Sequence, residues 1–189
     1  MRIVLDVENT VTKRNGKTHM DPFEPTNFLV QVGTKDVDSN ERHLLTFDHL
    51  EYSDRTGANA ELLQSLLDKT TLLIMHNAQH DLMWLWASGF KYDGEIYDTM
   101  LAEYILQRGQ KQSVSLLACA ERRNLNFQKD DTLKNYFKEG YNTNEIPLNE
   151  LTHYLGCDID TTTELFHAIN SEGYSQSCSN GMDRVRAIT

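Results

Sequence analysis

The chain has 189 residues, a formal net charge of −10, 24% charged residues and 39% hydrophobic residues. This length suits one domain with a buried core, and no apolar run is long enough to cross a membrane, so we expect no membrane partner. The acidic balance argues against a protein that binds nucleic acid through a generally basic surface, but it allows an acidic site that metal ions neutralise.

Strand patterns fill the first third of the sequence, separated by polar segments, at residues 2–7, 27–33 and 42–47. Helix and strand patterns then alternate, as a helix at 60–67, a strand at 71–75, a helix from 78 to about 89 and a short strand at 95–98. The rest is helical, at 100–108, 114–123, 133–139 and 148–169, with a break expected near Gly156 or Asp158. This order predicts an α/β fold, a mixed sheet flanked by helices with a helix-rich second half.

The sequence predicts a single domain over residues 1–170, followed by a tail at 171–189. The tail is rich in Ser, Gly and polar residues, so we expect it to be loosely ordered. The three cysteines are far apart without a Cys-x-x-Cys pair, which argues against a disulfide frame or a zinc cluster. No export signal precedes the first strand, so we expect a cytoplasmic location.

Two carboxylates stand at the end of the first predicted strand, in Asp6-Val7-Glu8-Asn9. Because residues two apart on a strand point to the same face, Asp6 and Glu8 are expected to converge. Their repulsion and partial desolvation are usually relieved by a bound cation or a captured proton. Alternatively the strand ends at Leu5, and both acids are solvated loop residues.

Further acids follow later predicted elements. Asp81 falls in the first turn of a helix, where the helix dipole alone favours an acid. Tyr154 and Asp158 are four residues apart, so they share one face of a helix, as many surface pairs do. Each pattern is weak by itself, because short motifs arise by chance.

Together these acids occur in an order that resembles the DEDD-type 3′-5′ exonucleases, specifically the proofreading domain of family A DNA polymerases and their phage relatives. The three matching motifs are Asp6-Val7-Glu8, Asn77-Ala78-Gln79-His80-Asp81 and Tyr154-Leu155-Gly156-Cys157-Asp158. The resemblance covers about residues 1–170 and implies a ribonuclease H-like fold.

The resemblance also implies a site for two Mg²⁺ or Mn²⁺ ions, which suit an all-oxygen ligand set. Asp6 would bridge both ions, Glu8 and Asp158 would hold the ion that activates water, and Asp81 would act partly through water on the second. Tyr154 would position the attacking water, since an ordinary tyrosine pKa near 10 makes it a poor base.

Histidines near these motifs raise two alternatives. His153, five residues before Asp158, satisfies the histidine version of the third motif, but successive helical residues are about 100° apart and cannot both face one water. We favour Tyr154. His76 and His80 are four apart, a zinc-like spacing, yet no third nitrogen or sulfur ligand lies nearby in sequence.

Contacts to substrate are predicted at Asn9, Asn77 and Phe127. Asn9 stands where the family often has a Thr that touches the terminal nucleotide, and Phe127 lies where an aromatic stacks on a base, although it could equally belong to the core. The region 108–138 is locally basic and is a candidate track for a single-stranded backbone, or else a solvated helical face.

The sequence therefore predicts a metal-dependent 3′-5′ exonuclease that removes 5′-nucleotides from single-stranded or frayed DNA ends, with a proofreading or replication-associated role. It would be either a free-standing enzyme serving a separate DNA polymerase, in the host cytoplasm if encoded by a phage, or an excised domain. A ribonuclease D-like RNA exonuclease is one alternative. A catalytically silent polymerase-docking module is the other, and the presence of all four carboxylates argues against it.

Overall fold

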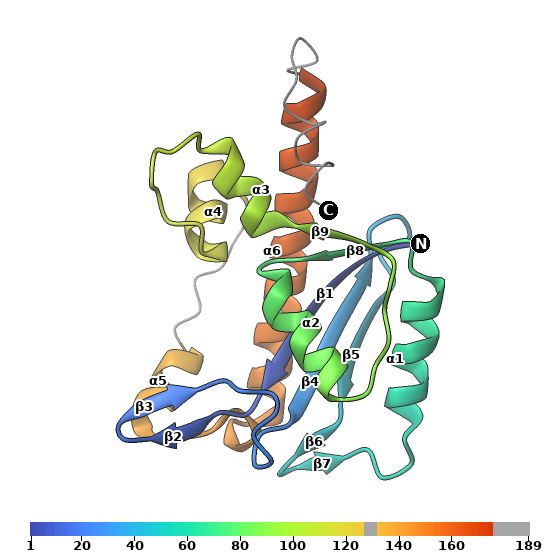
Figure 1. Cartoon of the computed structure of the whole chain (residues 1–189), viewed down its shortest axis with the longest axis vertical. Helices are drawn as coiled ribbons and strands as arrows, with labels where there is room; N and C mark the ends of the chain where they lie inside the picture. The colour runs from blue at the N-terminus through green and yellow to red at the C-terminus, as the bar shows by residue number, and fades with distance from the viewer. Residues whose placement is uncertain (127–131, 176–189) are drawn as a thin grey trace.

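A five-stranded mixed sheet in the order β5-β4-β1-β8-β9 forms the centre of the computed structural model, which describes residues 1–126 and 132–175 (Figure 1). Its strands are β1 (Arg2–Asn9), β4 (Leu29–Asp36), β5 (Arg42–Thr46), β8 (Leu72–Met75) and β9 (Glu95–Asp98). The first three form an antiparallel meander, and β8 and β9 continue the sheet in parallel beside β1. The predicted mixed sheet is confirmed.

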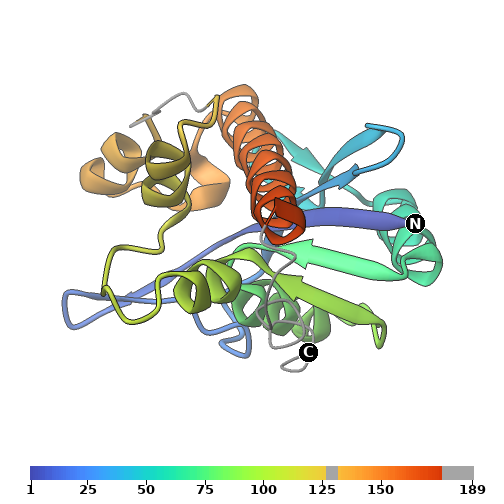
Figure 2. The same cartoon turned by 90° about the horizontal axis from the view of Figure 1, so that it is seen from above.

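Helices cover both faces of this sheet and fill the second half of the chain, as predicted. They are α1 (Ala58–Lys69), α2 (Ala78–Ala87), α3 (Thr99–Leu106), α4 (Leu116–Arg123), α5 (Thr132–Glu139) and α6 (Leu148–Ser175), with a 3₁₀ turn, η1 (Thr143–Glu145), before α6. Figure 2 shows α6 across one face of the sheet and α2 below the other. Within the described ranges, none of the helices has the length and apolarity needed to span a membrane.

Both faces of β1 are buried against helices. Ile3, Leu5 and Val7 belong to the core cluster that includes residues of α1 and α2. Val4 points the other way and packs with Leu155 of α6 in a second cluster. Because side chains alternate along a strand, Asp6 and Glu8 lie on the α6 side of β1.

The long helix α6 approaches the sheet closely at Gly33 of β4, which pairs with Asp6 of β1. A Cβ atom placed on Gly33 would lie 2.9 Å from Ile159 Cγ1 and 3.0 Å from Leu155 Cγ. Glycine at this position therefore allows α6 to pack near the carboxylates of β1.

We expect Gly33→Ala to lower the free energy of unfolding by about 1–3 kcal/mol, because the added methyl overpacks the interface between β4 and α6. Urea denaturation measures the change. Gly156→Ala is the matched control on α6, since its Cβ would meet Arg42 Nη1 at an ordinary 3.5 Å. This control should be neutral or stabilising by up to about 1 kcal/mol, as alanine favours helix. Equal destabilisation by both changes would contradict this account.

The structure differs from the sequence prediction in α6, which runs unbroken from Leu148 to Ser175. The expected break near Gly156 or Asp158 is wrong, because Leu155 and Ile159 on either side are fully buried against the sheet and hold the helix in register. The helix also continues past residue 170, the predicted end of the domain. The loosely ordered tail stays a prediction, as residues 176–189 lie outside the described residues.

Two short hairpins were not predicted. One joins β2 (Thr12–Arg14) to β3 (Lys17–His19), and the other joins β6 (Asp48–His49) to β7 (Tyr52–Ser53). Their strands have two or three residues each, too few to show an alternating apolar pattern. The first has a recognisable turn, since Asn15 and Gly16 both adopt positive φ, the conformation that an Asn-Gly hairpin turn requires.

Candidate active site

A cleft of about 250 Å³ lies where the end of β1 faces α6 and α5. It is lined by Asp6, Val7, Glu8, Leu133, Lys134, Phe137, Tyr154 and Asp158. The structure thus brings together four of the five side chains predicted to be catalytic, from two elements far apart in the sequence.

The positions of Tyr154 and Asp158 follow from helix geometry. Four residues separate them, so they lie one turn apart on the same face of α6, and the Tyr154 hydroxyl hydrogen-bonds the Asp158 carboxylate. Leu155 and Ile159 are each one position further along and are buried against the sheet. This packing fixes the rotation of α6 and turns Tyr154 and Asp158 toward the end of β1.

Asp81 reaches the site from α2 and is only 2% exposed. The strand β8 pairs with β1 only as far as Val4, so the later part of β1 has an edge that β8 does not cover. The start of α2 comes close to this edge, where the backbone amide of Val7 favours the charged form of Asp81 and the charge of Asp6 opposes it. Asp81 therefore lies beside Asp6, although it does not line the cleft.

The acids lie close together, Asp81 buried and the other three half-buried, and their pKa values respond. Burial raises the pKa of Asp6 to about 8, and the charge of Asp158 adds to the shift. Burial raises the pKa of Glu8 well above its usual range, and the charges of Asp6 and Asp158 add to the shift. Burial and the charge of Asp6 raise the pKa of Asp81 in the same way. Burial raises the pKa of Asp158 to about 6, against a hydrogen bond from Tyr154 that lowers it. Such a site favours bound cations or protons.

The residues present fit divalent cations by chemistry and charge. One oxygen of Asp81, Oδ2, is buried without a hydrogen-bond partner, a costly state that a cation or proton would relieve. All the acidic donors are carboxylate oxygens, the ligands that Mg²⁺ and Mn²⁺ prefer. Across residues 1–126 and 132–175, no group of three or more His, Cys, Asp or Glu side chains stands in an arrangement that could hold a metal ion. The four acids therefore do not form a preformed cage.

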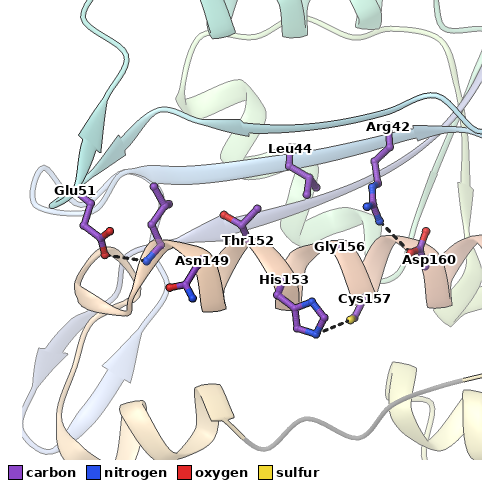
Figure 3. A pocket seen from close by; sticks show the side chains of 10 residues that line it. Arg42, Leu44, Glu51, Asn149, Thr152, His153, Gly156, Cys157 and Asp160 are labelled. Atoms are coloured by element: carbon purple, nitrogen blue, oxygen red, sulfur yellow. Dashed lines mark hydrogen bonds and ion pairs between the residues drawn. The ribbon is translucent and has the colours of Figure 1, made fainter.

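His153 and Tyr154 leave α6 in different directions. Tyr154 lines the cleft with the carboxylates, whereas His153 lines a separate groove of about 750 Å³, formed by residues of α6 and β5, and points toward Cys157 (Figure 3). There the His153 Nε2 atom lies 3.7 Å from Cys157 Sγ. Of the two alternatives for the third motif, the structure places only Tyr154 beside the acids.

The three predicted substrate contacts have different outcomes. Asn9 is only 6% exposed and its amide is used internally, since Oδ1 accepts from His80 Nε2 at 3.0 Å and Nδ2 donates to the Thr10 carbonyl. This arrangement argues against direct nucleotide contact by Asn9. Asn77 is exposed with a φ of 75° at the start of α2, outside the lining of the cleft. Phe127 lies outside the described residues.

Two residues that support the site were not predicted. Asp98, at the end of β9, accepts from the backbone N–H groups of Asn77 and Ala78 and from that of Met100, so it joins the first turns of α2 and α3. Its place before a helix is an N-cap pattern that the sequence shows. His80 supports Asn9, which only the three-dimensional structure reveals.

Another group missed from sequence is the α5 wall of the cleft, made of Leu133, Lys134 and Phe137. Phe137 is 40% exposed there. Two residues of the predicted basic track at 108–138 are used within the protein. Arg122 and Arg123 both pair with the buried Glu103. These arginines hold α4 against α3, and their charges are paired with Glu103.

Comparison with known proteins identifies the family and the fold of the chain. The model of the 3′-5′ exonuclease family matches residues 18–173, a span that includes Asp81, Tyr154 and Asp158 and begins after Asp6 and Glu8. A search among curated proteins finds no match.

Solved structures share the fold. They include the apo form of a nuclease (TM-score 0.67, 15% identity), Brucella melitensis NrnC bound to pGG (0.64, 14%) and the same protein with bound Mg²⁺ (0.62, 15%). Each alignment covers 99% of this chain and 78% or 79% of the other. At such low identity the likeness shows the fold alone, a ribonuclease H-like mixed sheet flanked by helices. Exonucleases of this kind use divalent metal ions. Since the family model matches most of its length, the chain belongs to the 3′-5′ exonuclease family.

Proposed function

We propose that the protein hydrolyses phosphodiester bonds at single-stranded or frayed DNA 3′ ends and releases 5′-nucleotides, with two Mg²⁺ or Mn²⁺ ions held by Asp6, Glu8, Asp81 and Asp158. The observation that carries the proposal is the meeting of these acids from β1, α2 and α6, where Asp81 is buried, the other three are half-buried and all four have raised pKa values. A fold under selection for stability alone would not bury them together.

Bound divalent ions would supply Lewis acidity, which lowers the pKa of a water molecule and stabilises the leaving 3′ oxygen. The protein itself would orient the reactants. Asp6 and Glu8 face the cleft from a rigid central strand, and Asp158 faces them from α6. This placement would hold the scissile phosphate between β1 and the α5 wall.

Tyr154 would act as a hydrogen-bond partner for the attacking water. Burial and the charge of Asp158 raise its pKa, so the hydroxyl keeps its proton at neutral pH and is not a general base. Its hydrogen bond to Asp158 fixes the ring beside the carboxylates.

We expect Tyr154→Phe to lower kcat by about 10–100-fold, because the water loses an orienting partner worth about 1.4–2.7 kcal/mol while the metal ligands remain. His153→Ala, the matched control, should change kcat by less than about twofold, since His153 lines the groove on the other side of α6. Steady-state hydrolysis of a labelled oligonucleotide measures both. A larger loss for the histidine variant would reverse the assignment.

An RNA substrate is the second candidate. One structure that shares the fold is of a protein bound to pGG, so short oligonucleotides are plausible ligands for this architecture. The same carboxylates and tyrosine would serve a ribonuclease D-like exonuclease. A separate DNA polymerase partner and a cytoplasmic, replication-associated role are part of the DNA proposal.

The test uses DNA and RNA strands of one sequence, labelled at the 5′ end, incubated with Mg²⁺, Mn²⁺ or EDTA. The proposal expects metal-dependent shortening of DNA from its 3′ end in single-nucleotide steps. Shortening of RNA alone would favour the second candidate. If neither strand is shortened with either metal, the protein is not an exonuclease and the docking alternative gains support.

A further inference from the structure

Gln31 of β4 is a buried amide beside the site that the proposed reaction does not use. It is 0% exposed, and it stands directly opposite Glu8 of β1 on one side and Thr46 of β5 on the other. Directly opposite residues of antiparallel strands share one face of a sheet, so Gln31 lies on the face that carries Glu8 and that α6 covers. The sheet therefore holds a polar side chain next to Glu8, under the helix that supplies Tyr154.

The Gln31 amide ties the sheet to α6. Its Nε2 atom donates to Thr46 Oγ1 and to Thr152 Oγ1, each at 2.8 Å. Figure 3 shows Thr152 on the side of α6 that faces the sheet. Thr152 comes two residues before Tyr154, so this hydrogen bond anchors the helix just ahead of the tyrosine.

Tyr154 thus lies between two contacts of α6 with β4. The Gln31–Thr152 hydrogen bond comes before it, and Leu155 comes directly after it, where its Cγ would be 3.0 Å from a Cβ on Gly33. Apolar packing is not directional, so the contact at Gly33 sets how closely the helix approaches. A hydrogen bond requires a particular angle, so the bond from Gln31 specifies the rotation of the helix at Tyr154.

An irregularity in strand pairing accompanies this arrangement. The pairing of β1 with β4 shifts between Glu8 and Asn9, which leaves Val30 without a partner on β1. Val30 belongs to the same core cluster as Leu151 of α6, and its neighbour Gln31 bonds α6 as well. Two successive residues of β4 therefore turn to the side that α6 covers. Bulges of this kind re-aim side chains and are common beside active sites.

The amide is costly for stability. Gln31 Oε1 is buried and has no hydrogen-bond partner among the residues that the structure describes. An unpartnered buried oxygen is less favourable than an apolar atom of the same size. A sequence shaped by stability alone would place methionine or leucine here, so the amide indicates a role in placing α6.

We propose that Gln31 is a positioning residue: through its hydrogen bond to Thr152 it holds the start of α6 in the rotation that aims the Tyr154 hydroxyl at the attacking water. This inference rests on the proposed function, because it takes the role of Tyr154 from it. Asp158 lies a further turn along α6, where apolar packing against the sheet holds the helix. Gln31 therefore places the tyrosine and leaves the proposed metal ligands where they are.

The first test is Gln31→Met, which replaces the amide with an apolar side chain of similar size. Well below the Tm it should lower kcat on a labelled oligonucleotide about tenfold, since small misplacements of a reacting group can cost up to about 10²-fold. Mn²⁺ affinity, measured by calorimetric titration without substrate, should stay the same. The Tm should rise or stay within about 4 °C of wild type, because the unpartnered oxygen is removed.

Thr34→Val is the matched control on β4. Thr34 is 1% exposed, its Oγ1 also has no partner within the described ranges, and it stands opposite Leu5 on the other face of the sheet. The change removes a buried polar group without touching α6. It should leave kcat and Mn²⁺ affinity unchanged.

Two comparisons separate positioning from a merely structural role. In a Tyr154→Phe background, Gln31→Met should lower kcat further by less than about twofold, because the hydroxyl that it places is gone. Thr152→Val should reproduce the loss seen with Gln31→Met. Thr152→Ser, which keeps the hydroxyl, should stay within about twofold of wild type.

Fluorine NMR gives a readout without catalysis. With fluorotyrosine in place of tyrosine, and the Tyr154 resonance assigned through Tyr154→Phe, Gln31→Met should shift that resonance and Thr34→Val should not. If wild-type protein shortens no strand, the proposed function fails, and the resonance still tests whether Gln31 places Tyr154. The inference is overturned by an unchanged resonance, by an equal kcat loss in the Tyr154→Phe background, or by an equal loss in the control. If Gln31→Met does not fold, the two Thr152 variants decide.

Discussion

Asp6→Asn should lower kcat on 3′ ends by about 10³-fold, the largest effect expected of any single change in this protein. Asp6 lies at the centre of the acids, since its charge acts on both Glu8 and Asp81. A neutral amide there would weaken cation binding and remove several kcal/mol of transition-state stabilisation, at about 1.4 kcal/mol for each factor of ten. Single-turnover hydrolysis of a labelled strand measures the loss.

The same change should stabilise the protein in EDTA. Asp6 is half-buried close to other acids, so the isosteric amide removes repulsion and a desolvation cost while keeping the shape of the side chain. Thermal unfolding would show a higher Tm for the variant than for wild type.

Asp160→Asn is the matched control on α6, because Asp160 pairs favourably with Lys35 and Arg42 outside the cleft. This control should keep activity and lower the Tm slightly or leave it unchanged. An active Asp6→Asn protein, or one with a lower Tm in EDTA, would remove Asp6 from the centre of the site.

Local periodicity predicts much of this arrangement. Alternation along β1 places Asp6 and Glu8 on one face, and the four-residue spacing in α6 places Tyr154 and Asp158 on another. The sequence does not show that these two faces meet. That depends on tertiary packing, including the close approach that Gly33 allows.

Other features that depend on tertiary packing were missed or wrongly predicted, because the sequence does not show which elements meet. Phe137 joins the cleft because α5 packs against α6, and no local pattern reports this. The break expected in α6 relied on Gly156, a local helix breaker, but buried neighbours outweigh its propensity. Arg122 and Arg123 look like ligand contacts in the sequence until the structure shows their pairing with Glu103.

The stability of the metal-free protein should fall as the pH rises from about 4 to about 8. Asp6, with a pKa of about 8, and Asp158, with a pKa of about 6, bind protons in the folded state at pH values where an unfolded Asp, near 3.9, has lost its proton. The raised pKa values of Glu8 and Asp81 act in the same direction. Folding is therefore most favourable where the acids are protonated, and this contribution is lost as they ionise.

Mg²⁺ should offset this loss of stability at high pH. Cations and protons compete for the same carboxylates, so the rise in Tm on replacing EDTA with Mg²⁺ should be small near pH 5 and large near pH 8. Thermal unfolding across this range measures it, and Asp6→Asn should flatten both the fall in EDTA and the rise with Mg²⁺. Exonuclease activity should increase over the same interval as the acids ionise. A Tm in EDTA that climbs toward pH 8, or an equal Mg²⁺ shift at both ends of the range, would mean that these carboxylates do not form the cation site.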